Sequence, residues 1–417
     1  MPQSKFVSAS ADRAFQDLRY ISEVNSRIAG TDGDRRAADY VSRTFKRSGL
    51  KVEYDEFEAV SFIENSTELR IVSPEERELN ARAMLYSVGT PPEGAKGEAV
   101  YLGLGTREDF ETANVKDKIA VIKRAPDKDN WWNEVSLASD NGAMALVMAD
   151  NNPYIFTATL ETGFFANDKR FREIAPKPVP FVGTNRDDGA HLIELTEKAR
   201  VQVELKVDVV LENRSTKNVR GLIRGGRRAK EKIVVTAHRD SVTTPGANDN
   251  GSGTAVLLEL SRILSKHKPK RTIELMSLGA EEVYGQLGSL NYCKSHKQEL
   301  KDIKALVNVD MVAVGSELKI ITEGHWPDKS IKTTPWINSL LFETARKLGY
   351  KAEYGTCIHG TSDEGRFIDA GVPSAWLWKP DDPYYHTLED TADKVNANDL
   401  KAVTDIVCST VLQLADK

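Results

Sequence analysis

The chain has 417 residues, a length that fits two domains or one large α/β domain carrying an insertion. Its 57 basic and 62 acidic residues are mixed along the sequence and give a net charge of −5. No basic stripe marks a nucleic-acid partner, and no window approaches the ~18 apolar residues of a membrane span. We therefore expect a water-soluble globular protein that binds neither nucleic acid nor membrane.

The cysteines and the first residues bear on the compartment. Cys293, Cys357 and Cys408 lie far apart, are odd in number and form no CxxC pair, which favours a reducing compartment over a disulfide framework or a thiolate metal site. The opening "MPQSKFVSASADRAF" lacks the apolar core of a signal peptide, so the chain as written is expected to be cytoplasmic. A leader removed from the sequence would instead make the protein secreted or periplasmic.

The first elements are helical. Phe15, Leu18 and Ile21 recur at helical spacing, and a second helical segment ends at Gly49, before the alternating run "KVEYDEFEAV", which predicts a strand. Between residues 67 and 212, short β-like runs such as "AVYLGLG" and "KIAVIKRA" are broken by Pro and Gly clusters, with two helical stretches among them. We interpret this part as an inserted, β-rich domain.

From Asn218 onward, apolar strands alternate with amphipathic helices, beginning with "KIVVTAH" and "TAVLLELSRILSKH" and continuing with "TIELMSLGAEE" and "ALVNVDMVA". This alternation predicts a mainly parallel mixed sheet sandwiched by helices. Residues 1–66 and 213–417 are accordingly assigned to one α/β domain, and residues 67–212 to the insert.

Polar residues gather at the ends of the predicted strands, where open α/β sheets bind their ligands. They comprise two histidines and several carboxylates: His238, Asp240, Asp249, Glu281, Glu282, Asp310 and His386. Imidazole and carboxylate without thiolate suit Zn²⁺, with Co²⁺ or Mn²⁺ as substitutes, and carboxylates allow two ions to share a bridging group. Two such ions activate water for hydrolysis in aminopeptidases and phosphatases.

Two of these acids have distinct expected roles. Glu281 and Glu282 are neighbours on an extended chain and point to opposite sides, so one can bind metal while the other acts as general base. A pair of solvated surface acids is the alternative. Asp240, two residues after His238, is placed to accept the second imidazole N–H and fix the ring's tautomer.

Six motifs together resemble those of the co-catalytic zinc aminopeptidases, relatives of glutamate carboxypeptidase, the transferrin receptor and glutaminyl cyclases. They are "HRDS", "GANDNGSG", "GAEEVYGQLGS", "NVDM", "GTSDEGRF" and "YYHTLEDTADKV". The resemblance implies the zinc exopeptidase fold for the α/β domain. The insert, with "VKDKIAVIKR" and "ASDNGAMALVMAD", resembles a protease-associated (PA) domain, which borders the active-site cleft in relatives.

The resemblance also implies roles by position. It implies two zinc ions, one on His238 and Asp310, the other on Glu282 and His386, with Asp249 bridging them and Glu281 as general base. The Asp249–Asn250 peptide bond is expected to be cis.

The chain departs from the family at two positions near the expected site. Many relatives read "SDH" where this chain has Ser362-Asp363-Glu364. His359 stands where several relatives carry a tyrosine thought to steady the tetrahedral oxyanion, and we expect its N–H to donate to the same oxygen.

These observations favour a metallo-exopeptidase, specifically an aminopeptidase that releases N-terminal amino acids from peptides through a metal-bridging water activated by Glu281. A carboxypeptidase or dipeptidase would recognise a carboxylate with arginines, and no such cluster is evident. A glutaminyl cyclase would work with one metal and lack the insert, and a receptor-like homologue would have lost ligands that are all present here. A Cys357 nucleophile with His359 as its base explains fewer residues. The side-chain preference, the physiological metal and homo-oligomer formation stay open.

Overall fold

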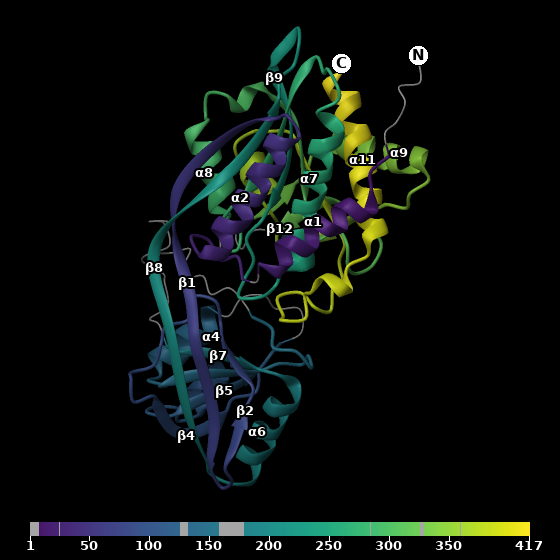
Figure 1. Cartoon of the computed structure of the whole chain (residues 1–417). Helices are drawn as coiled ribbons and strands as arrows, with labels where there is room; N and C mark the ends of the chain where they lie inside the picture. The colour runs from purple at the N-terminus through teal and green to yellow at the C-terminus, as the bar shows by residue number, and fades with distance from the viewer. Residues whose placement is uncertain are drawn as a thin grey trace. The chain divides into compact units, whose positions relative to one another are not determined.

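The computed structural model describes residues 8–24, 26–125, 132–157, 179–283, 285–325, 329–358 and 360–417 (Figure 1). The chain forms two compact units. The first comprises Met1–Ala59, Ser215–Tyr385 and Asp390–Lys417, and the second comprises Val60–Arg214 and His386–Glu389. The chain passes between them inside two long strands, β1 (Lys51–Ser73) and β8 (Val201–Ile223), and again on either side of the segment His386–Glu389.

The first unit is built on a mixed sheet with the strand order β13-β12-β15-β11-β9-β10-β8. Its centre is parallel and consists of β15 (Ser374–Trp378), β11 (Ile303–Val309), β9 (Arg228–His238) and β10 (Arg271–Leu278). Antiparallel partners follow on either side, β8 on β10 and β12 (Lys319–His325) on β15. At the far edge β12 also pairs with β13 (Ser330–Lys332) and β14 (Glu353–Cys357). The predicted mainly parallel mixed sheet is confirmed.

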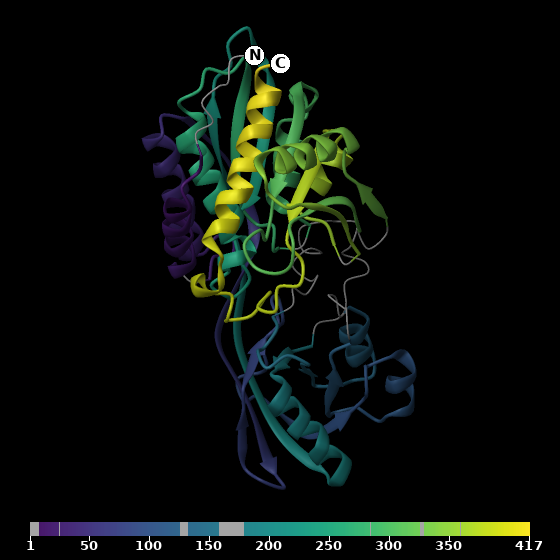
Figure 2. The same ribbon diagram turned by 90° about the vertical axis from the view of Figure 1, so that its right-hand side faces the viewer.

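Helices cover both faces of this sheet, because alternate strand residues point to opposite sides and are apolar on both. Val235 of β9 belongs to the larger core with α1 (Ala11–Glu23), α2 (Asp32–Arg47), α7 (Gly253–Leu264), α9 (Pro335–Leu348) and α11 (Ala397–Ala415). Its neighbour Val234 faces the other core with α8 (Leu287–Ser295) and α10 (Glu364–Asp369). Figure 2 shows α11 lying along the sheet.

The second unit has its own sheet, in the order β8-β4-β5-β6-β7-β3. The middle strands β4 (Ala95–Tyr101), β5 (Ile119–Lys123), β6 (Ala145–Ala149) and β7 (Phe181–Thr184) run parallel, and β3 (Ala81–Ala83) closes the edge. The short β2 (Arg77–Leu79) pairs with β1. Within the described part of this unit, the strands are accompanied by the helices α3 (Arg107–Thr112), α4 (Trp132–Asp140) and α6 (Arg186–Lys198).

Strand register places the expected site residues at one edge of the first sheet. His238 pairs with Leu278 across β9 and β10, and Asn308 of β11 pairs with Thr236 of β9. Because the three strands are parallel and in step, the loops that follow them begin side by side. Short helical turns complete the unit: η1 (Ala247–Ser252), η2 (Leu300–Asp302) and η3 (Ala392–Lys394). Among the helices of the described residues, none has the length and apolar character to cross a membrane.

The burial of Leu341 in the larger core predicts how its substitution affects stability. Leu341 on α9 is completely buried, so Leu341→Ala leaves a cavity and should lower the free energy of unfolding by about 2–5 kcal/mol. Ser339→Ala, an exposed change on the same helix, should stay within about 0.5 kcal/mol of the unsubstituted protein. Urea unfolding followed by circular dichroism measures both, and equal midpoints for the two variants would contradict the assignment of Leu341 to the core.

Candidate metal centre

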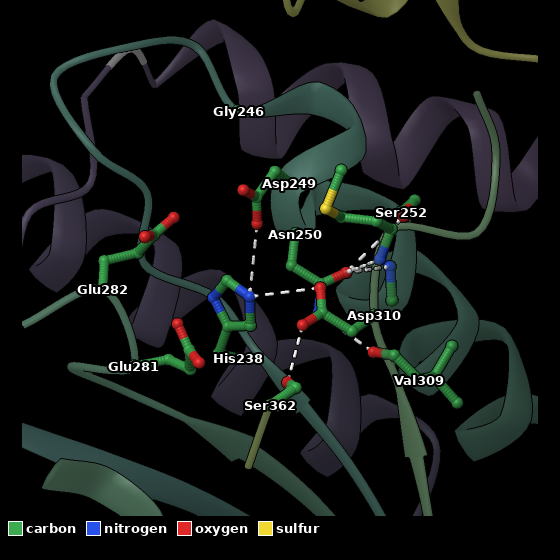
Figure 3. Close-up of polar contacts among 12 residues, drawn as sticks. His238, Gly246, Asp249, Asn250, Ser252, Glu281, Glu282, Val309, Asp310 and Ser362 are labelled. Atoms are coloured by element: carbon green, nitrogen blue, oxygen red, sulfur yellow. Dashed lines mark hydrogen bonds and ion pairs between the residues drawn. The ribbon is translucent and has the colours of Figure 1, made fainter. Parts of the chain in front are cut away.

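His238 ends β9 with its imidazole buried among carboxylates. Its Nε2 atom lies 3.3 Å from Asp249 Oδ1 and 3.3 Å from Asp310 Oδ1 (Figure 3). Burial alone would lower the pKa of His238, but Asp310 and the other carboxylates outweigh it and raise the pKa well above its ordinary value. Two acidic groups facing one ring nitrogen make this a place that attracts positive charge.

Asp249 is presented by the loop between β9 and α7. The loop turns at Gly246, whose φ is 55°, and an added Cβ there would lie 2.3 Å from the main-chain oxygen of Asp249. The Asp249–Asn250 peptide bond is cis, as expected. The Asn250 side chain ties the loop to its neighbours, because Nδ2 donates to Val309 O at 2.9 Å and Oδ1 accepts from Gly253 N at 2.8 Å.

Asp390 holds the same loop from the C-terminal part of the chain. Its two carboxylate oxygens accept from Asn248 N at 2.7 Å and from Asp249 N at 3.0 Å. Burial raises the pKa of Asp390 to about 8 despite these two donors. Asp390 lies within the motif "YYHTLEDTADKV" but is not among the residues predicted for the site.

Asp240 organises the loop that carries the two adjacent glutamates. Its Oδ1 accepts from Glu281 N at 3.1 Å and its Oδ2 from Glu282 N at 3.0 Å. The nearest partner of His238 Nδ1 is the main-chain oxygen of Asp240 at 3.2 Å, with Oδ1 at 3.6 Å. The carboxylate of Asp240 thus holds the backbone of the glutamate loop, while its main-chain oxygen is the nearer partner of the imidazole. The expected role of Asp240 in fixing the tautomer of His238 stays a prediction.

Asp310 follows β11 and is oriented by a second set of polar groups. Its Oδ2 accepts from the Ser362 hydroxyl at 2.6 Å. Glu364 supports this arrangement, since Oε1 accepts from the Thr361 hydroxyl at 2.6 Å and Oε2 from Asn308 Nδ2 at 3.1 Å. Asn308 Nδ2 also donates to Ser362 Oγ at 2.9 Å. Glu364 is therefore buried with both carboxylate oxygens hydrogen-bonded, and burial raises its pKa to about 7.

The structure brings together most of the residues expected at the site. His238, Asp249 and Glu282 each offer a ligand atom, and these atoms lie within 4.8 Å of one another, all in buried side chains. Asp310 joins them through its contact with His238. Removal from water raises the pKa of Glu281 well above its ordinary value, and the nearby charge of Glu282 raises it further. An imidazole nitrogen with several carboxylate oxygens and no thiolate is a donor set that fits zinc.

For two expected residues the structure does not test membership of this group. His386 belongs to the second unit, where its ring stacks on Phe156 with 5.5 Å between centroids and its main-chain oxygen accepts from Thr157 N at 2.9 Å. Its role as a metal ligand stays a prediction. His359 lies outside the described residues. Cys357, considered as a nucleophile, is buried in an apolar cluster with Ile321 and Trp376.

Known proteins resemble this chain along nearly all of its length. Residues 218–411 match the family described as "Peptidase family M28", and residues 90–192 match the "PA domain". Aminopeptidase YwaD of Bacillus subtilis (strain 168) is 29% identical over 420 residues, covering 98% of this chain and 85% of that protein. A probable leucine aminopeptidase 2 of Aspergillus oryzae is 30% identical, covering 87% of this chain and 71% of the relative. The solved structure of a zinc aminopeptidase from Bacillus subtilis is 27% identical in sequence. It superposes with a TM-score of 0.78, and the match covers 98% of this chain and 95% of that protein's chain.

The contacts of Asp240 predict an effect on metal affinity. Asp240→Asn leaves one acceptor oxygen for two N–H donors and turns an amide donor toward the second, which displaces the glutamate loop. We expect zinc affinity to fall about 10- to 100-fold in competition with a chelating dye. Asp39→Asn, an exposed change on α2, should bind zinc as the parent does. Equal affinities in the two variants would show that Asp240 does not shape the site.

Proposed function

Because this chain belongs to peptidase family M28 and carries an inserted PA domain, we propose that it acts as a zinc aminopeptidase with two zinc ions. The observation that supports this most directly is the buried group of His238, Asp249 and Glu282 at the ends of adjacent strands, with Asp310 against His238. Its homologues are named as aminopeptidases, and peptides with a free N-terminus are the proposed substrates. Such a reaction is a hydrolysis that removes one residue at a time.

The ligands are proposed as the family resemblance implies. His238 and Asp310 would hold one ion, Glu282 and His386 the other, and Asp249 would bridge. When bound, the two ions supply the positive charge that acidifies water and polarises the scissile carbonyl. The assignment of His386 rests on its position in the motif, and the other four on both motif and geometry.

Glu281 is the proposed general base. It would accept a proton from the attacking water and pass it to the leaving amine, a role suited to a buried carboxylate beside the proposed ligand Glu282. Asp240 accepts from the Glu281 main-chain N–H and so places this residue relative to the ligands. The N–H of His359 stays the proposed donor to the tetrahedral oxyanion.

Substrate screening with metal analysis tests the proposal. The zinc-loaded protein should hold two zinc ions per chain and cleave aminoacyl substrates with a free N-terminus, while blocked peptides stay intact. Exhaustive chelation should abolish the activity, and added Zn²⁺ or Co²⁺ should restore it.

Each alternative has its own outcome in that experiment. Cleavage of N-terminally blocked peptides from the C-terminus would indicate a carboxypeptidase, and a single zinc ion with cyclisation of N-terminal glutamine would indicate a glutaminyl cyclase. Activity that survives exhaustive chelation would refute metal-dependent hydrolysis altogether.

A substitution tests the proton transfer separately from metal binding. Glu281→Gln removes the proton acceptor and should lower kcat by about 10²-fold or more while zinc content is unchanged. Glu343→Gln on α9, a half-exposed acid paired with Arg346, should leave kcat unaltered. A near-normal kcat in the Glu281 variant would assign the base to another residue.

A further inference from the structure

Arg27 is a completely buried arginine in the segment between α1 and α2, far in sequence from the ligands. Burial of a guanidinium is costly unless its N–H groups are satisfied, and carboxylates are its usual partners. The hydrogen-bond partners of the Arg27 side chain are instead main-chain carbonyl oxygens. The side chain of Arg27 therefore fixes the course of the main chain around it.

The acceptors of Arg27 lie at both ends of the loop that joins two proposed ligands. Nε donates to the oxygen of Arg239, the residue after His238, at 2.6 Å. Nη2 donates to the oxygen of Gly246, where the loop turns toward Asp249, at 2.8 Å, and Nη1 donates to the oxygen of the preceding Pro245. One rigid, planar group thus spans the start and the end of the loop.

Two more contacts complete this clamp. The Arg27 main-chain N–H donates to Ser241 Oγ at 3.1 Å, and the Ser241 hydroxyl donates to Thr244 O at 3.1 Å. Nη1 also donates to Ile21 O at 3.3 Å, which anchors the guanidinium to the end of α1. The loop from residue 239 to 246 is therefore held against a helix rather than by its own contacts alone.

The positive charge of Arg27 and its hydrogen bonds are expected to have opposite effects on zinc affinity. Burial lowers the pKa of Arg27 to about 10, and the acids Asp390, Asp240 and Asp249 oppose that change, so the group stays cationic at neutral pH. A fixed cation near the site repels metal ions, so removing the charge alone would strengthen zinc binding. Loss of the clamp would weaken it, and the two effects can be told apart.

We propose that Arg27 is a positioning residue that sets the separation of His238 and Asp249 and so prepares the site for zinc. The inference rests on the proposed function, because it takes these two residues to be metal ligands. Arg27 touches neither of their side chains in any contact that the described residues show, and it acts through the main chain on either side of the loop.

The test compares Arg27→Lys with Arg27→Gln in metal-free protein titrated with Zn²⁺ against a chelating dye. Lysine keeps the charge but has one donor nitrogen and cannot reach carbonyls at both ends of the loop, so zinc affinity should fall about 10-fold or more. Glutamine also lacks the several donors of the guanidinium and should lower zinc affinity as well. Arg13→Lys, a half-exposed arginine of α1 paired with Glu259, is the matched control and should bind zinc normally.

Two further measurements separate positioning from stability. The absorption spectrum of the Co²⁺-loaded protein should change in Arg27→Lys, because a shifted ligand alters the coordination geometry, whereas loss of stability alone leaves the spectrum of folded protein unaltered. Circular dichroism of the metal-free variants establishes that they are folded. If Arg27→Lys fails to fold, Ser241→Ala removes one clamp contact and should lower zinc affinity about threefold or more.

Three results would overturn the inference on Arg27. Parental zinc affinity and Co²⁺ spectrum in folded Arg27→Lys, or parental affinity in Ser241→Ala when Arg27→Lys does not fold, would overturn the inference. Tighter zinc binding in Arg27→Gln would overturn it too, because charge would then outweigh geometry. Absence of zinc binding in the parent protein would overturn the proposed function and this inference with it, so the two failures are distinguishable.

Discussion

The parallel alignment of β9, β10 and β11 is the constraint on which the rest of the site depends. These strands are buried on both faces, and their register brings His238, the loop of Glu281 and Glu282, and Asp310 to one edge. Apolar side chains on both faces hold that register, because a slip by one residue would exchange the two faces of a strand. Because the apolar side chains stabilise the sheet, the residues at the strand ends are not needed for stability and can be polar.

Several carboxylates in one buried place repel one another, and the chain offsets that repulsion with backbone donors. Asp240 accepts from two main-chain N–H groups, and Asp390 accepts from two others. Ser362 and Asn308 do the same for Asp310 and Glu364 with their side chains. Asp249 and Glu282 are thus each held at the main chain by an acid that is not expected to bind metal, and Asp310 is held at its carboxylate by a serine hydroxyl. The raised pKa values of Glu364 and Asp390 show that these donors do not fully compensate for burial.

Much of this arrangement was predictable because its signals are local. Hydrophobic periodicity identified the strands and helices, and the polar residues that follow "KIVVTAH" and "ALVNVDM" marked the site. The unit boundaries within β1 and β8 leave no such signal, since a long strand continues through them. Arg27, Ser362 and Asp390 were missed as parts of the site for a related reason. Their contacts with the ligand loops join segments distant in the chain, and an isolated arginine, serine or aspartate is ordinarily exposed.

The sequence by itself determined the fold class and the chemistry of the donor set, because residue type and short-range spacing carry that information, and its motifs carried the resemblance to the family. Only the tertiary structure decided which atoms meet. It showed that Asp240 binds the glutamate loop with its carboxylate and His238 with its carbonyl, and that Arg27 bridges the two ends of the loop from His238 to Asp249. The physical reason is that every residue carries the same main-chain carbonyl group. The residue types therefore do not show which carbonyl accepts a hydrogen bond, and only the folded chain places it.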